Sequence, residues 1–418
     1  MADLLRELRF ALGDKTVVWT LCIALVLSFL ALVMGVMNVN QQSERLEGLR
    51  SSVIEEQGYT LSSQSDAGSA AYYVFHLAYD PPSPLSYVAL GLRNELPWLH
   101  RVRMLALEGQ IYENDAGNPE LASLGDLDFT YLAAIILPLL LIALLYDLDA
   151  RERRDARFEL LCATSYLGDR VLHVRAFARV ILLLAAILLP LLIIALLTAT
   201  AGMATITVFT VVVLHALFWL LVCRLVSRLN IEASTAAAVL LGVWLLLTVL
   251  IPISGKTLTE KMVAVPQGGN ILLLQRETVN GAWDLPKPTT MNAFISTHPE
   301  WKETPAIKRP FEWRWYYAFQ QVGDQKAESM SVALEEGMRR RADLMNKVAF
   351  LSPQLLTEKW LTKVAKTDVG QHLAYMRCVR NFHAALRDFH YPMLFGDQEY
   401  SESYMNKLPR FEACQSQV

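Results

Sequence analysis

Charged residues are scarce in this chain of 418 residues, because Asp, Glu, Lys and Arg together supply only 19% of it. A soluble globular protein carries about 25% charged residues. The apolar share of 53% is correspondingly high. This balance excludes an ordinary soluble protein, but it leaves too much charge for a chain buried wholly in lipid. We therefore expect several membrane-spanning segments joined to a large water-facing part.

The chain also lacks a strong net charge and a dense set of cysteines. The formal net charge is −3, so the chain as a whole has no electrostatic attraction to nucleic acid. The five cysteines stand far apart, which excludes a disulfide-dense scaffold and a zinc ribbon. No repeat and no low-complexity tract is visible.

Long apolar runs dominate what is present. A helix that rises 1.5 Å per residue needs about 20 apolar residues to cross a hydrocarbon core of about 30 Å. Five runs meet this need, and the first is too long for a secretory signal and lacks a cleavage site. The predicted spans are residues 17–37, 129–147, 180–199, 203–223 and 233–253. The predicted fold class is an α-helical polytopic membrane protein with about five spans and mostly helical extracytoplasmic domains.

The distribution of arginine predicts the orientation of these spans. Residues 148–179 hold seven arginines, Arg224 and Arg228 follow the fourth span, and the turn at 200–202 has none. Lys and Arg in short loops mark the cytoplasmic side. We therefore expect a multi-pass protein of the bacterial inner membrane with its N-terminus and residues 148–179 in the cytoplasm. Residues 38–128 and 255–418 are then two periplasmic inserts.

The two inserts differ in predicted structure. Residues 38–128 begin as a helical extension of the first span and continue as a small mixed domain of low regularity. In residues 255–418, the Gly and Pro content of 265–310 indicates irregular chain. Helical periodicity follows over 325–349, and a further helix is expected from Thr367-Asp368 to about Arg387.

The leader, residues 1–16, has apolar side chains at helical spacing opposite charged ones. Leu4, Leu5, Leu8 and Leu12 lie on one side, and Arg6 and Arg9 on the other. This pattern is typical of a helix lying in the cytoplasmic interface of a membrane. The alternative is that these residues are the first turns of the first span.

The segment after the second span is the most informative one. Arginines alone would suffice to set orientation, but four acidic residues are interleaved with them, and acidic residues contribute little to topology. These are Asp149, Glu152, Asp155 and Glu159. A short mixed-charge helix with an apolar edge suits docking to a soluble partner. The predicted docking residues are Arg151, Glu152, Arg153, Arg154, Arg157, Phe158, Leu160 and Leu161.

Other candidate motifs carry little chemistry. Gly255-Lys256-Thr257 resembles the end of a phosphate loop, but Leu250 occupies the position of the required earlier glycine. His215 is an ionisable residue within a span, for which we favour a hydrogen bond to a neighbouring helix. His372 and His383 would lie about 16 Å apart on one helix, too far for one metal ion. We predict no catalytic, cofactor-binding or metal-binding residue in this chain.

Two cysteines fall outside the membrane on this topology. Cys378 and Cys414 both belong to residues 255–418, and an oxidising compartment would permit a bridge between them. The sequence leaves open whether they pair.

Several short motifs are spread along the chain. They are Pro81-Pro-Ser-Pro-Leu85, Leu137-Pro-Leu, Leu145-Tyr-Asp147, Glu152-Arg-Arg154 with Leu160-Leu161, Leu351-Ser-Pro-Gln-Leu355, Gly370-Gln-His-Leu373 and Leu408-Pro-Arg-Phe411. In this order they resemble the ABC-2 type transporter permease family, in its bacterial branch with two large extracytoplasmic inserts. Asp155-Ala-Arg157 departs from the Gly-Thr that usually follows the acidic-arginine motif. Relatives also have a sixth span after the Leu-Pro-Arg-Phe motif, which these 418 residues do not contain; either that helix is missing from them or this subunit has five spans.

The resemblance implies the membrane subunit of an ABC transporter. ATP and Mg²⁺ would bind to separate ABC ATPase subunits on the cytoplasmic side, and this chain would hold no cofactor. A second permease subunit, identical or paralogous, would pair with it in the bilayer. The alternative function is a membrane sensor or assembly scaffold without ATPase coupling. An intramembrane enzyme would need paired acids or a histidine cluster within the spans, and the sequence shows neither.

Overall fold

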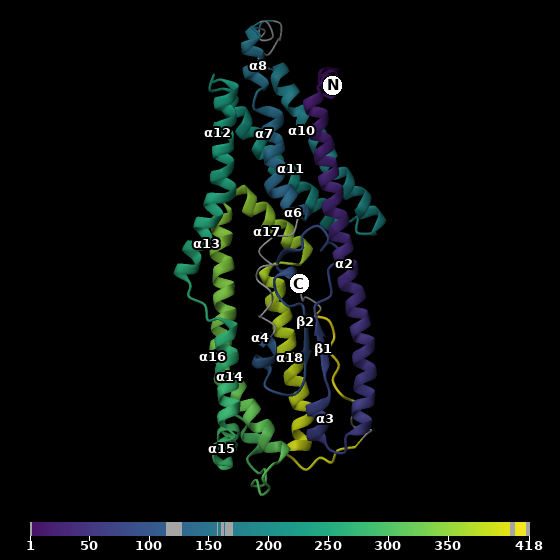
Figure 1. Cartoon of the computed structure of the whole chain (residues 1–418), viewed down its shortest axis with the longest axis vertical. Coiled ribbons are helices and arrows are strands. Elements are labelled where there is room, and N and C mark those ends of the chain that lie inside the picture. The colour runs from purple at the N-terminus through teal and green to yellow at the C-terminus, as the bar shows by residue number, and fades with distance from the viewer. Residues whose placement is uncertain are drawn as a thin grey trace.

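The computed structural model describes residues 2–113, 128–156, 158–159, 163, 170–401 and 406–414. The molecule is elongated, with long apolar helices at one end and a mostly helical domain at the other (Figure 1). We call these parts the helix bundle and the domain. The N-terminus and α8 lie at the far end of the bundle, which we call the arginine end, and α3 and α15 lie at the far end of the domain.

Within the described residues, five helices are long and apolar enough to cross a membrane. They are Lys15–Ser63, Phe129–Arg154, Arg170–Leu197, Met203–Ser227 and Ala233–Met262. Their elements are α2 (Lys15–Ser63), α6 (Phe129–Tyr131), η3 (Leu132–Ile136), α7 (Leu137–Leu145), α8 (Leu148–Arg154), α10 (Arg170–Leu197), α11 (Met203–Ser227), α12 (Ala233–Leu245), η4 (Leu246–Leu250) and α13 (Ile251–Met262). The prediction of an α-helical membrane protein is confirmed at this level.

The leader is a helix of its own, α1 (Ala2–Gly13), which packs against α10. Asp14 separates it from α2 by adopting an extended conformation and accepting a hydrogen bond from the N–H of Thr16 at 2.9 Å. This is an N-cap, which satisfies one of the free donors at a helix start. The alternative that the leader forms the first turns of a continuous span is therefore wrong.

Two of the long helices contain a π-helical segment, and each segment adjoins a proline. Pro138 follows η3 and Pro252 follows η4. Proline has no N–H to donate to the carbonyl four residues earlier, so the regular α-helical ladder is interrupted there. In the fold, both segments face α17 (Pro353–Ala365).

The domain combines both predicted inserts in one packed unit. Strand β1 (His76–Tyr79) pairs antiparallel with β2 (Leu99–Val102), His76 lying opposite Val102. One core cluster joins Ala78 of β1 to Ile271 and Tyr375 from the later insert. The remaining elements are α3 (Ala67–Tyr73), η1 (Gly91–Asn94), α4 (Leu107–Tyr112), α14 (Gly268–Gly281), α15 (Lys287–Thr297), η5 (Pro299–Trp301), α16 (Trp313–Ala349) and α18 (Val369–Leu394).

The expectation of irregular chain over 265–310 is wrong, because α14 and α15 occupy much of it. The glycines and prolines that suggested it lie at the helix ends. Gly268 and Gly281 begin and end α14, and Pro288 lies in the first turn of α15. Proline is tolerated in a first turn because its missing N–H would have no partner there.

Candidate functional site

The arginine end is held together by buried ion pairs between helices. Arg224 Nη1 of α11 lies 2.7 Å from Asp149 Oδ1 of α8. Arg175 of α10 reaches Glu152 Oε1 of α8 at 2.6 Å and Glu7 Oε2 of α1 at 2.8 Å. All three carboxylates are buried. Four helices are therefore tied to one another by charge at this end.

These contacts give the acidic residues of α8 a role that the sequence interpretation missed. Asp149 and Glu152 face the protein's own arginines instead of extending outward. Their sequence spacing, three positions apart on one helical face, was the available signal. Asp149 and Glu152 are explained by internal pairing, and these two residues no longer argue for docking to a partner, whereas Asp155 and Glu159 of the same segment are exposed.

The predicted docking residues fall into three groups. Arg151 and Arg154 are exposed, and Arg151 Nη1 lies 3.9 Å from Asp14 Oδ2. Arg153 bonds inward, because its Nη1 donates to Asn230 Oδ1 at 3.1 Å and its Nη2 donates to the carbonyl of Ser227. The Arg153 guanidinium carbon also lies 5.1 Å from the ring centroid of Phe158. Arg157, Leu160 and Leu161 lie outside the described residues. Among the predicted docking residues that the structure describes, Arg151 and Arg154 are thus the arginines exposed at the surface.

His215 has the kind of partner that the sequence favoured. Its Nδ1 lies 3.0 Å from Oγ1 of Thr357, which belongs to α17. Sequence reasoning did not identify Thr357, because 142 positions separate the two residues.

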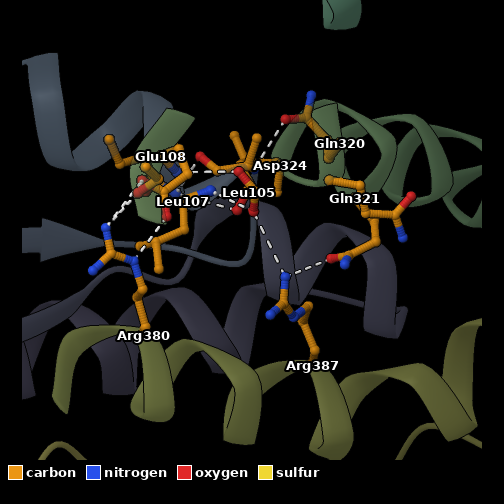
Figure 2. Close-up of polar contacts among 12 residues, drawn as sticks. Leu105, Leu107, Glu108, Gln320, Gln321, Asp324, Arg380 and Arg387 are labelled. Atoms are coloured by element: carbon orange, nitrogen blue, oxygen red, sulfur yellow. Dashed lines mark hydrogen bonds and ion pairs between the residues drawn. The ribbon is translucent and has the colours of Figure 1, made fainter. Parts of the chain in front are cut away.

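A polar cluster in the domain joins the early insert to the late one (Figure 2). Arg380 of α18 bonds Glu108 of α4 through Nε at 2.9 Å and Nη2 at 3.2 Å. It also pairs with Glu335 of α16 and donates to Ser331 Oγ at 2.7 Å. The two acids raise the pKa of Arg380, although burial acts to lower it. This arginine thus stays charged and links three helices.

Asp324 caps a helix that lies far away in the sequence. Its carboxylate accepts the backbone N–H groups of Leu107 at 2.8 Å and Glu108 at 3.1 Å, at the start of α4. Gln320, one turn earlier on α16, accepts the N–H of Ala106 at 3.0 Å (Figure 2). Burial raises the pKa of Asp324 to about 7, while the two N–H groups and Arg387 lower it.

A pocket of about 320 Å³ opens beside this cluster, between α4, α16 and α18. Its walls carry side chains of both charges from three helices that are distant in the sequence, so no sequence pattern predicted it. The lining includes Glu108, Asp324, Glu328, Glu335, Arg377, Arg380 and Arg387. Most of the buried members bond one another, and the exposed charges at the rim are Glu328 and Arg377.

Several histidines of the domain are buried in their neutral form. Burial lowers the pKa of His76 to about 4 and the pKa values of His383 and His390 to about 3. Within the described residues, no three His, Cys, Asp or Glu side chains are grouped so that they could hold a metal ion. These histidines belong to the domain core.

The structure joins Cys378 and Cys414 in a disulfide. Cys378 lies on α18, and Cys414 lies in the segment that returns from the far end of the domain toward the bundle (Figure 1). The bond therefore fastens this returning segment to the helix beneath it. Cys22 and Cys223 are free thiols, and Cys162 lies outside the described residues.

Comparison with known proteins gives one match and bears on the domain. No match was found among curated proteins or among solved structures. Residues 270–413 match the family model described as Domain of unknown function (DUF3526). This range begins in α14 and ends one residue before Cys414. The match to that family therefore covers the later part of the chain, after the last predicted span, and includes none of the predicted spans.

Proposed function

We propose that this chain is the permease subunit of an ABC transporter in the bacterial inner membrane. The arginine end faces the cytoplasm, where separate ATPase subunits bind ATP and Mg²⁺, and the domain faces the periplasm. A second permease subunit completes the transporter in the bilayer. The chain itself hydrolyses no ATP, and its task is to transmit movement from the ATPases to the spans and the domain.

The observation that carries this proposal is the continuity of α2. The helix has 49 residues and begins at Lys15, beside the arginine end. At 1.5 Å per residue it is about 74 Å long, more than twice the hydrocarbon core of about 30 Å. Its distal half packs through Leu46 and Val53 against Leu77 and Tyr79 of β1. One helix thus connects the proposed ATPase side directly to the domain.

The ion pairs at the arginine end support the same proposal. Breaking a buried ion pair by removing one partner costs about 3–5 kcal/mol. Arg175 and Arg224 each make such contacts between helices. A push on α8 is therefore passed to α1, α10 and α11 together. This suits a two-state movement of near-rigid helices, in which ATPase closure favours one of two arrangements.

Two forms of the mechanism follow from the same geometry. The cargo passes between the two permease subunits, or the spans transmit force to the domains, which act on cargo already outside. The length of α2 and its contact with β1 favour the force-transmitting form.

Copurification tests the proposal. The tagged chain is solubilised from its own host membranes, and ATP hydrolysis is measured in the purified complex. Arg151→Glu with Arg154→Glu is expected to release the ATPase, since both side chains are exposed and reversal leaves the internal bonds of Arg153 intact. Arg339→Glu with Arg340→Glu, a matched exposed pair on the domain, is expected to retain it.

Retained ATPase and unchanged hydrolysis in the Arg151/Arg154 variant would remove the docking assignment. A purified complex without any ATPase would favour the alternative function, a sensor or assembly scaffold. The pocket of about 320 Å³ in the domain, with charges at its rim, is the feature that such a sensor would use.

A further inference from the structure

The corner between α16 and α17, residues 348–357, packs against the helix bundle. Ser352 Oγ donates to the carbonyl of Leu247, in the π-helical segment η4, at 2.7 Å. Leu247 precedes Lys256, the first charged residue on that helix, by nine positions, or about 13 Å at 1.5 Å per residue. The corner therefore lies beside the apolar part of the last span.

A contact with a second span independently indicates the same depth for the corner. Thr357 on α17 contacts His215, which lies at the centre of α11, twelve positions from either end. At the inner face of α17, Leu361 and Ala365 are buried within the core of the bundle. Thus α17 is packed among the spans, although the sequence placed all of residues 255–418 outside the membrane.

The opposite face of this corner is apolar and uncovered. Phe350 is 80% exposed and Leu351 66%, and Trp360, three residues beyond the corner on α17, is 48% exposed. Leu250 and Ile253, on the adjoining span near the same level, are also exposed. The surface of a span at this depth is covered by acyl chains, and the exposed face of the corner continues that surface.

The chemistry of the corner fits a lipid environment. Residues 348–357 contain no charge, and they are flanked by Lys347 and Glu358. Hydrocarbon tolerates no free backbone donors. At this turn the N–H of Leu351 donates to the carbonyl of Val348 at 2.9 Å, and the N–H of Ser352 to that of Ala349 at 3.1 Å. These two backbone donors are therefore satisfied within the protein.

We infer that the α16–α17 corner is a re-entrant element, which enters the bilayer from the domain side and contacts acyl chains through Phe350, Leu351 and Trp360. Its entry is guided by close packing, because a Cβ on Gly255 of α13 would lie 2.5 Å from Val348 Cγ1. This inference goes beyond the proposed function and holds whether or not an ATPase binds the arginine end.

Fluorescence quenching by spin-labelled lipid tests it. Leu351→Cys is introduced into the full chain with Cys22, Cys162 and Cys223 replaced, and the thiol is labelled with an NBD probe. The protein is reconstituted in phosphatidylcholine vesicles that carry doxyl groups on their acyl chains. Leu250→Cys in the last span is the positive control, and Tyr59→Cys, 79% exposed near the far end of α2, is the negative one.

The expected result is a blue-shifted emission at position 351, with a loss of fluorescence comparable to that at position 250. Water-like emission without quenching would overturn the inference. A blue-shifted emission without quenching would also overturn it, because protein and not lipid would then cover the corner. Gel filtration of each variant establishes that it is folded, and the exposure of Leu351 makes this substitution mild.

Discussion

Asp324 accepts a hydrogen bond at 2.8 Å from the backbone N–H of Leu107, a residue 217 positions away. With this contact a side chain of the late insert caps a helix of the early insert. Asp324→Ala removes this cap and leaves Arg387 without its acid. We expect a loss of about 2–4 kcal/mol in domain stability. The midpoint of thermal unfolding in detergent measures it. Asp343→Ala, an exposed aspartate on the same helix, is the control, and an equal shift there would contradict the assignment.

Acid should destabilise the domain through its buried histidines. The folded pKa values of His76, His383 and His390 are about 4, 3 and 3, below the ordinary value of 6.5. Their contribution is fully present above pH 6.5 and is lost as the pH falls toward the folded values. At pH 5.5 each histidine lowers the free energy of unfolding by about 1.2 kcal/mol relative to pH 7.

Asp324 has the opposite effect on how the stability of the domain depends on pH. Its folded pKa of about 7 lies above the ordinary value of 3.8, so acidification from pH 7 toward 4 favours the folded state through this group alone. Three histidines outweigh one carboxyl, and the unfolding temperature should fall between pH 7.5 and 5.5. His383→Gln should flatten this pH dependence. An unchanged slope in that variant would mean that His383 titrates normally.

Loss of Arg175 should lower the stability of the helix packing at the arginine end. Arg175→Met leaves Glu7 and Glu152 buried without their common cation. We expect a cost of about 3–5 kcal/mol, the range for a broken buried ion pair. Arg154→Met removes an exposed arginine from α8 and should change stability little. Unfolding temperatures of the two variants in detergent provide the comparison, and similar values would show that the Arg175 pairs contribute nothing.

A side chain at Gly35 should disturb the contact between α2 and the domain. A Cβ at this position would lie 2.2 Å from the carbonyl oxygen of Tyr87, so Gly35→Ala must move the backbone of one segment. Gly48→Ala, on the same helix with open space around it, should instead stabilise by about 0.5–1 kcal/mol. The unfolding temperatures of the two variants should therefore shift in opposite directions. Equal shifts would argue against close contact at Gly35.

The disulfide should protect the returning segment from proteolysis. Lys407 and Arg410 are exposed trypsin sites in that segment, and the bond fastens its end to α18. Cys414→Ser is expected to speed cleavage there, and a bond of this kind contributes about 2–4 kcal/mol. Cys22→Ser changes an exposed free thiol and serves as the control. Identical cleavage rates in both variants would mean that the bond does not hold the segment.

The long helices were predictable because hydropathy depends on sequence alone. Contacts between distant positions were not. Asp149 and Glu152 resembled docking residues because their arginine partners, Arg224 and Arg175, lie on other helices. The misassigned range 265–310 failed for a local reason, since Gly and Pro mark helix ends as readily as loops.

The location of α17 was hidden for a different reason. Its residues are too polar for a hydropathy search, and Glu358 and Lys359 suggest water. Both charged side chains have partners within the chain: Lys359 Nζ donates to Asn346 Oδ1 at 2.7 Å, and Glu358 accepts from Gln354 Nε2 at 2.7 Å. The packing of Ser352 and Thr357 on the spans reveals the place of α17.

The π-helical segment η4 has a geometric consequence for the domain. A π turn accommodates one residue more than an α turn, and one residue of an α-helix corresponds to about 100° of rotation. If η4 changed from π-helical to regular α-helical geometry, α13 would rotate about its axis relative to α12. Gly255 and its neighbour Val348 would be carried around with it. A change of helix type within five residues, Leu246–Leu250, would thus rotate the surface against which α16 packs.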